Sequence, residues 1–156
     1  MCGIESMDMT RPVAILIIGL IGLAAPALAA DSALVIDARR LTVMMSEARE
    51  IETTLGLNPP PEPAVPSTDD VPALLGQAID SYNGLAQQAC AARAIEAALC
   101  TGPYRPAWRA PASAAPDDAS LRRWTDETAQ RLTPFWSALC AKAPKPDDSE
   151  PVCPME

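Results

Sequence analysis

The chain has 156 residues, of which 49% are hydrophobic and only 4% aromatic, and it contains 17 prolines, 5 cysteines and no histidine. Its 12 Lys and Arg residues against 20 Asp and Glu residues give a net charge of −8. This balance argues against a nucleic-acid partner, because nucleic-acid binding needs a basic surface that displaces phosphate counterions. The missing histidine removes the commonest general base and the commonest imidazole metal ligand.

The N-terminal region has the pattern of a secretory signal peptide. Residues 12–30 carry no charge and contain the small-residue pattern Ala27-Leu28-Ala29, which is typical of a cleavage site. The alternative is an uncleaved membrane anchor, since about 18 apolar residues just span a bilayer. Pro26 and the directly following Asp31 argue against an anchor. We therefore predict that residues 1–30 are a signal peptide, and that the mature protein is periplasmic or secreted without a stable membrane span.

The residues before the apolar run fit a signal peptide less well. Glu5 and Asp8 lie where a positive charge is expected, and only Arg11 opposes them. A start at Met9 instead leaves Arg11 and a free amino group as a short positive region. We predict that Met9 is the true first residue.

The first segment of the predicted mature chain, residues 31–56, has the periodicity of an amphipathic helix. Gly56 supplies its stop. Its apolar residues recur at three- and four-residue steps and form a single stripe: Leu34, Ala38, Leu41, Met45, Ala48, Ile51 and Leu55. The stripe predicts packing against the alanine-rich second helix. The alternative is docking on another chain, because part of the stripe also has seven-residue spacing.

The second predicted helix begins at Asp69 or Asp70 as cap, with Pro72 in its first turn, and ends at Gly102. It carries apolar residues along its whole length: Leu74, Leu75, Ala78, Ile79, Tyr82, Leu85, Ala89, Ala92, Ile95 and Leu99. No segment alternates as a strand does. The pattern therefore predicts one continuous second helix in an all-α chain.

The third predicted helix begins at Asp117 or Asp118. Its inner face is formed by Leu121, Trp124, Thr128 and Leu132. Pro134 should end it, because a proline ring clashes with the preceding helical turn at a cost of about 3 kcal/mol. A separate short helix should then follow from Pro134 to about Ala143. We expect Trp124 of the third helix and Phe135 and Trp136 of this short helix to lie in the core.

Two proline-rich stretches separate these helices. The first connector, residues 57–70, holds five prolines, and the second connector, residues 101–117, holds four. Both should be extended and largely polyproline-like. The predicted organisation is a signal peptide (1–30), an N-terminal amphipathic helix (31–56), a proline-rich linker (57–70) and a disulfide-linked helical domain (71–156). The fold class is a three- to four-helix bundle joined by proline-rich connectors.

Cleavage removes Cys2 and leaves an even number of cysteines, Cys90, Cys100, Cys140 and Cys153, which predicts two disulfides in an oxidising compartment. On one continuous helix Cys90 and Cys100 would lie about 15 Å apart. A disulfide needs Cα atoms within about 4.4–6.8 Å, so this pair is disfavoured.

With a third helix antiparallel to the second and a chain reversal at Pro134, Cys140 would reach the level of Cys90. We therefore predict Cys90–Cys140 and Cys100–Cys153. The alternative is Cys90–Cys153 with Cys100–Cys140.

The sequence selects no catalytic residues, no metal ligands and no cofactor. Adjacent carboxylates at Asp69-Asp70 and Asp117-Asp118 precede helices, where they act as caps. No C-x-x-C redox motif is present. Two alternatives stay open: a histidine-free enzyme that uses carboxylates or a thiol, and a soft-metal site built from Cys and Met.

The second connector interleaves Tyr104, Arg105, Trp108 and Arg109 with prolines. Tyr, Trp and Arg are enriched at binding hot spots, and Arg recognises carboxylate or phosphate. These four residues are the binding candidates. The alternative is that Trp108 fills a gap between helices and that the arginines pair with local carboxylates.

The composition and the absence of catalytic motifs together favour binding over catalysis. We expect a small exported protein of the cell envelope, for example an inhibitor or accessory protein. Its partner would be an envelope protein, a cell-wall component or an anionic ligand.

Overall fold

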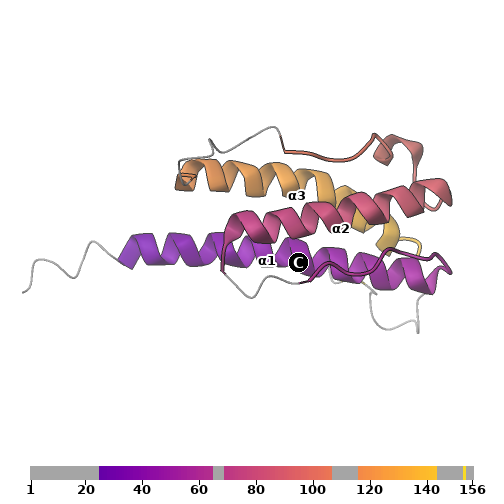
Figure 1. Cartoon of the computed structure of the whole chain (residues 1–156), viewed down its shortest axis with the longest axis horizontal. Coiled ribbons are helices and arrows are strands. Elements are labelled where there is room, and N and C mark those ends of the chain that lie inside the picture. The colour runs from indigo at the N-terminus through magenta and orange to yellow at the C-terminus, as the bar shows by residue number, and fades with distance from the viewer. Residues whose placement is uncertain (1–24, 65–68, 107–115, 144–152, 154–156) are drawn as a thin grey trace, which may run out of the picture.

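The computed structural model describes residues 25–64, 69–106, 116–143 and 153, with side chains from residue 33 onward. It contains three α-helices, α1 (Ala25–Thr54), α2 (Val71–Ala91) and α3 (Asp118–Cys140), and a short 3-10 helix, η1 (Ala97–Leu99). The described ranges hold no strand, and α1 packs against both α2 and α3 (Figure 1). The predicted all-α helix bundle is therefore confirmed. None of the helices within these ranges is apolar and long enough to cross a membrane.

The predicted apolar stripes form the core. On α1 every predicted stripe residue from Leu34 to Ile51 is buried, and Leu55 is half-buried. On α2 the stripe is buried up to Ala89, and on α3 the predicted core residues Trp124, Phe135 and Trp136 are all buried. The rings of Tyr82 and Phe135 meet edge to face at the centre of the bundle, with centroids 5.2 Å apart.

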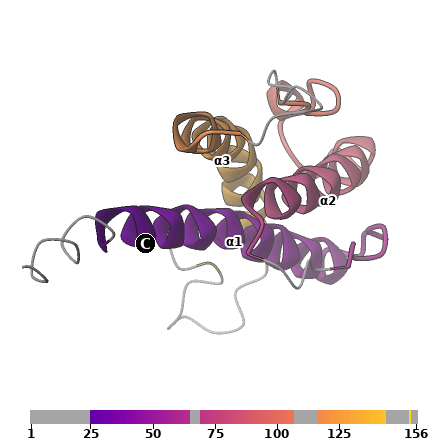
Figure 2. The same ribbon diagram turned by 60° about the vertical axis from the view of Figure 1, so that its left-hand side comes forward.

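All three helices run in the same direction (Figures 1 and 2). In the first half of α1, Arg39 pairs with Asp69, directly before α2, at 2.6 Å. In the second half of α1, Glu47 accepts a hydrogen bond of 2.9 Å from Trp136, in the second half of α3. The antiparallel arrangement expected for the third helix is therefore wrong.

The length of the connectors explains this parallel arrangement. Short loops place successive helices antiparallel. An extended polyproline-like chain advances about 3.1 Å per residue, so the 14 residues of the first connector (57–70) span roughly 40 Å. The 21 residues of α2 rise only about 32 Å. Each connector is thus long enough to run back along the bundle, and the next helix begins at the same end as the previous one.

The first connector lies against α1 and α2 as far as the structure describes it. The guanidinium of Arg49 donates a hydrogen bond to the carbonyl of Pro60, and the amide of Gln77 donates one of 3.2 Å to the carbonyl of Pro63. A Cβ atom at Gly84 would lie 2.6 Å from Cγ of Pro60. Glycine at this position therefore lets the connector approach the backbone of α2.

The second helix ends at Ala91 rather than at Gly102, which corrects the prediction of one continuous helix. Arg93 adopts a left-handed φ of 55°, and the amide of Ala94 donates to the carbonyl of Ala89 at 2.8 Å. This is the Schellman arrangement that ends many helices, usually with glycine in the left-handed position. Because arginine occupies that position here, residue type gave no stop signal.

The predicted break at Pro134 is also wrong, because α3 continues through Pro134 to Cys140. Proline removes one backbone hydrogen bond and kinks a helix. The later part of α3 turns toward α1 in Figures 1 and 2. Phe135 and Trp136 are buried directly after the proline. We infer that burial of these two aromatic rings outweighs the cost of the proline.

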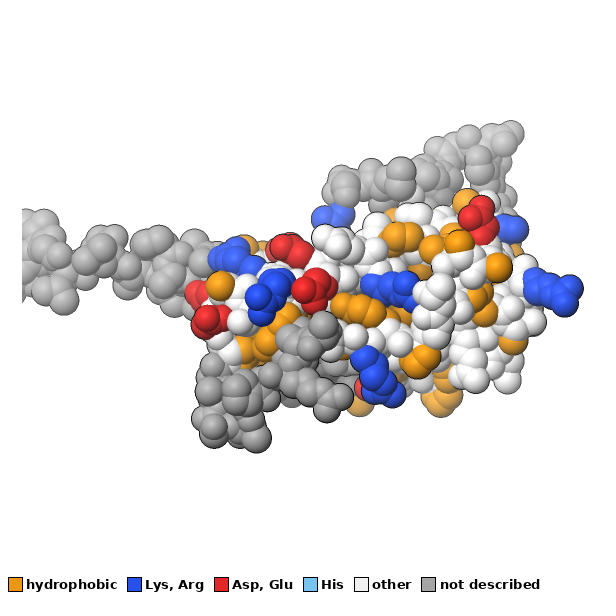
Figure 3. Space-filling model, turned by 90° about the horizontal axis from the view of Figure 1, so that it is seen from above, with side chains coloured by type: hydrophobic (Ala, Val, Ile, Leu, Met, Phe, Trp, Pro, Cys, Tyr) orange, Lys and Arg blue, Asp and Glu red, His pale blue; other side chains and the backbone are white. Residues whose placement is uncertain are grey.

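Parallel helices bring their positive N-terminal ends together, and acidic residues lie at those ends. Asp70 is the N-cap residue of α2, and Asp117 is that of α3. The Asp117 carboxylate accepts a hydrogen bond of 2.8 Å from the amide of Ser120. Hydrogen bonding to the Ser120 side chain, and then to its backbone, lowers the pKa of Asp117. On the face seen in Figure 3, acidic side chains gather toward the end from which the N-terminal trace leaves. The carboxylates of Asp70 and Asp117 offset the aligned dipoles of α2 and α3.

Candidate functional site

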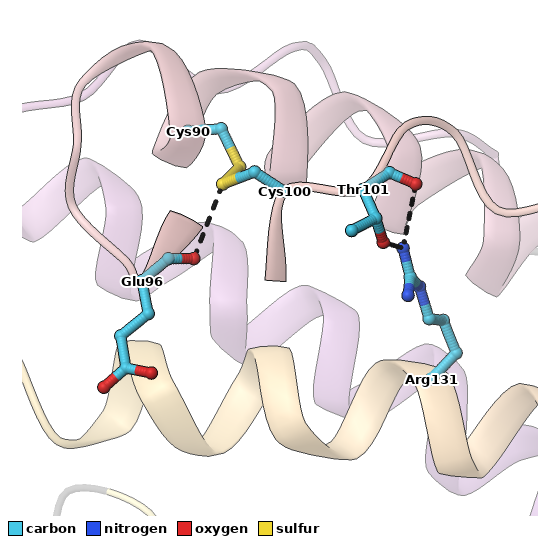
Figure 4. The surroundings of a disulfide bond; sticks show 5 residues. All are labelled: Cys90, Glu96, Cys100, Thr101 and Arg131. Carbon is cyan, nitrogen blue, oxygen red and sulfur yellow. Dashed lines mark hydrogen bonds between the residues drawn. A yellow bond between two sulfur atoms is a disulfide. The ribbon is translucent and has the colours of Figure 1, made fainter. Parts of the chain in front are cut away.

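The disulfides differ from both predicted pairings: Cys90 bonds to Cys100, and Cys140 bonds to Cys153. Because α2 ends at Ala91, residues 92–100 fold back and bring the Cα atoms of Cys90 and Cys100 to 5.8 Å. The sulfur of Cys100 also lies 3.6 Å from the carbonyl oxygen of Glu96, as Figure 4 shows. Each disulfide therefore closes a short local loop instead of joining two helices.

The predicted binding residue Tyr104 belongs to the packing of the second connector. The side-chain amide of Asn83 holds its backbone on both sides, accepting from the Tyr104 amide at 2.7 Å and donating to the Tyr104 carbonyl at 3.1 Å. Its half-buried ring meets the ring of Tyr82 edge to face. Burial raises the pKa of the Tyr104 hydroxyl. Tyr104 therefore attaches the connector to α2.

Arg131 fixes the same connector from the other side. Its guanidinium donates to the hydroxyl of Thr101 at 2.6 Å and to the Thr101 carbonyl at 3.3 Å (Figure 4). Of the other predicted binding residues, Arg105 is exposed. Trp108 and Arg109 lie outside the described residues. The structure thus does not bring the four candidates together as one described site.

A surface groove runs between the parallel helices α1 and α3, with a volume of about 840 Å³. Its apolar floor is formed by Leu41 and Met44 of α1 and by Ala129 and Trp136 of α3. Val43, which is 55% exposed, stands on the α1 side of the groove. Ile36, seven residues or about two turns before Val43, is also exposed. These are the only exposed large hydrophobic residues among the described side chains.

The polar residues of the groove are mostly acidic. Asp37 and Glu47 of α1 and Asp126 of α3 face a single basic residue, Arg40. Glu47 is fixed in place, because its Oε2 atom accepts the hydrogen bond from Trp136. The groove therefore combines an apolar floor with a net negative rim, which suits an apolar surface flanked by positive charge.

No pattern in the sequence predicted this groove. The stripe Leu34 to Leu55 concerned only the buried face of α1, whereas Ile36 and Val43 lie outside it, seven residues apart. That spacing places both on one face of a helix and was the available signal. The spacing of Ile36 and Val43 does not indicate which helix lies beside α1.

One buried carboxyl lies outside the groove. Glu52 of α1 is 0% exposed, and neither of its oxygen atoms has a hydrogen-bond partner. Burial raises the pKa of Glu52 from 4.5 to about 7, although the positive charge of Arg49 opposes the shift. Its backbone carbonyl accepts from the amide of Leu57, at the start of the first connector. The protonation of Glu52 thus makes the stability of the end of α1 depend on pH.

The described residues provide no cluster of three or more His, Cys, Asp or Glu side chains that could hold a metal ion. Four cysteines are consumed in the two disulfides. Sulfur in a disulfide is neither a nucleophilic thiolate nor a thiolate ligand. Among the described residues, these four cysteines therefore offer no free thiolate to an enzyme or a metal ion.

Comparisons of this chain with protein-family models, with curated proteins and with solved structures returned no match.

Proposed function

We propose that this chain is an exported protein of the cell envelope that acts by binding a partner rather than by catalysis. The observation that carries the proposal is the groove between α1 and α3. An apolar floor with few, placed polar groups is the usual character of a binding site. Val43 exposes a large apolar side chain at its edge, at an energetic cost that contact with a partner would relieve.

Export is supported by the disulfides and by the position of the core. Disulfides persist in oxidising compartments such as the periplasm. The first core residue among the described side chains is Leu34, so removal of residues 1–30 would take away none of the described core. The signal-peptide pattern of residues 12–30 supports the same compartment.

Export is tested by expressing the chain in a bacterium with and without residues 1–30. The protein expressed from the full chain should appear in the fraction released by osmotic shock. Its mass should be that of a chain whose first residue is Ala30 or Asp31, and it should contain no free thiol. The shortened chain should stay in the cytoplasm with reduced cysteines. A full chain that keeps residues 12–30 and stays in the cytoplasm would contradict the proposal.

Binding is tested by placing a photo-crosslinking amino acid at position 43 in the exported chain. A discrete adduct in the envelope fraction is expected at position 43 and not at position 98, where Ala98 is exposed on η1. Equal adducts at both positions would indicate unspecific contact and would contradict a groove that binds a partner.

A further inference from the structure

The groove between α1 and α3 is long enough to hold one more short helix. Its lining extends from Asp37 to Glu47 on α1 and from Thr125 to Ser137 on α3. At 1.5 Å per residue, these stretches are about 15–18 Å long, which corresponds to roughly three helical turns. An amphipathic helix of about 12 residues would place apolar side chains on the floor at three- and four-residue steps.

The charge of the rim selects the kind of helix. Three carboxylates, Asp37, Glu47 and Asp126, line the groove against the single guanidinium of Arg40. The whole chain carries a net charge of −8, so a basic partner is also attracted at longer range. An acidic helix, including a second copy of α1 with its own carboxylates, would meet like charge on this rim.

We propose that the α1–α3 groove binds an amphipathic helix with a cationic flank, carried by another protein of the envelope. The apolar side chains of that helix pack on Met44, Ala129 and Trp136, beside Val43. Its Lys or Arg residues lie over the carboxylates of Asp37 and Asp126. This inference deepens the proposed function, on which it rests, by naming the surface and the chemistry of the partner.

The test uses two labelled helical peptides of 14 residues and the full oxidised chain. One peptide carries Leu at the i, i+3, i+4 and i+7 positions and Lys elsewhere, and the other replaces every Lys by Glu. Fluorescence anisotropy should show at least tenfold tighter binding of the Leu/Lys peptide. Equal binding of both peptides would overturn the charge selection.

Two variants separate groove binding from general attraction to an acidic protein. Val43→Glu and Ala98→Glu each add one negative charge at an exposed position, but only Val43 lines the groove. Val43→Glu should weaken binding of the Leu/Lys peptide at least tenfold despite its added charge, and Ala98→Glu should leave it within twofold. Unchanged or tighter binding by Val43→Glu would overturn the proposal.

Both variants should melt within a few degrees of the wild type, because the replaced side chains are exposed. If Val43→Glu unfolds the chain, Val43→Ser serves as the second variant and should weaken binding severalfold. Sedimentation tests the other occupant: a dimer that Val43→Glu dissociates would mean that a second copy fills the groove and would overturn the proposal. Failed export would instead refute the proposed compartment, whatever the peptides do.

Discussion

Each of the two proline-rich connectors joins successive parallel helices, and neighbouring residues of α2 hold both connectors in place. The first connector (57–70) crosses α2 at Gly84, where a missing side chain makes room for Pro60. The second connector (101–117) is held at Asn83, whose amide bonds both backbone groups of Tyr104. At this crossing point the first connector thus depends on the absence of a side chain, in addition to the Gln77 amide, whereas the second connector depends on the Asn83 amide.

The covalent support of the two connectors also differs. The second connector follows directly on Cys100, and the Cys90–Cys100 disulfide fixes its starting point on α2. The described part of the first connector contains no cysteine and relies on the Schellman turn at Gly56 and on Arg49. The length of the connectors thus allows the helices to run parallel, although the core lies in the helices.

The largest expected effect comes from opening the disulfide that precedes the second connector. Cys100→Ser should lower the free energy of unfolding by about 3 kcal/mol, since a disulfide across a loop of this size restricts the unfolded chain by about that amount. The melting temperature should then fall by roughly 10 °C. In the exported variant that lacks residues 1–30, and with them Cys2, thiol labelling should find Cys90 as the one reactive cysteine. Labelling of Cys140 or Cys153 instead would contradict the observed pairing.

The next effect concerns Glu52, in the last turn of α1 before the first connector. Its pKa in the folded chain, about 7, lies above the ordinary value of 4.5, so folding favours the protonated carboxyl. Stability is therefore lost as pH rises from 4.5 to about 7. Glu52→Gln should remove this loss and be more stable than the wild type by about 2–3 kcal/mol near pH 8, with no such gain near pH 4.

Urea unfolding across this pH range measures the effect of Glu52→Gln. Glu50→Gln is the matched control, because Glu50 is exposed on the same helix and should keep the wild-type pH dependence. Parallel pH profiles for Glu52→Gln and the wild type would show that Glu52 does not titrate in a buried site.

The contact between the first connector and α2 is tested by a pair of glycine substitutions. Gly76→Ala meets no atom within 4 Å and should stabilise α2 by about 1 kcal/mol through helix propensity. Gly84→Ala gains the same propensity but pushes Pro60 away, which costs about 1–3 kcal/mol. Chemical denaturation should therefore rank Gly84→Ala below Gly76→Ala. Equal stability of the two variants would mean that Pro60 does not pack on Gly84.

The smallest effect compares the two helix ends from which the connectors depart. Gly56 and Arg93 both have left-handed φ, 77° and 55°, at the end of a Schellman turn. Arg93→Gly should raise the free energy of unfolding by about 0.5–1 kcal/mol, whereas Gly56→Ala should lower it by about 1 kcal/mol. Thermal denaturation of both variants checks the opposite signs, and a destabilised Arg93→Gly would contradict the assigned turn.

Periodicity and residue type predicted the parts of the fold that depend on local sequence. The stripes of α1 and α3 and the stop at Gly56 followed from apolar spacing and from the backbone freedom of glycine. The end of α2 could not be predicted, because an arginine takes the position that glycine usually fills. The path of α3 through Pro134 depends on the burial of Phe135 and Trp136, which is a tertiary effect.

The candidate site was less predictable than the fold. The groove requires α3 to lie parallel to α1, which two connectors of this length allow but which no helix pattern in the sequence predicts. A second helix that continues to Gly102 would hold Cys90 and Cys100 too far apart to bond, which leaves only pairings across helices. Both wrong disulfide pairings therefore had one origin, the missed turn at Arg93.

The most direct test of this account is disulfide mapping of the exported chain by proteolysis and mass spectrometry without reduction. We expect peptides joined through Cys90–Cys100 and through Cys140–Cys153, because each bond closes a loop that is local in the sequence. Peptides joined through Cys90–Cys140 or Cys90–Cys153 would contradict the turn at Arg93 that ends α2 and brings Cys90 to Cys100. They would also contradict the assignment of each disulfide to a local loop.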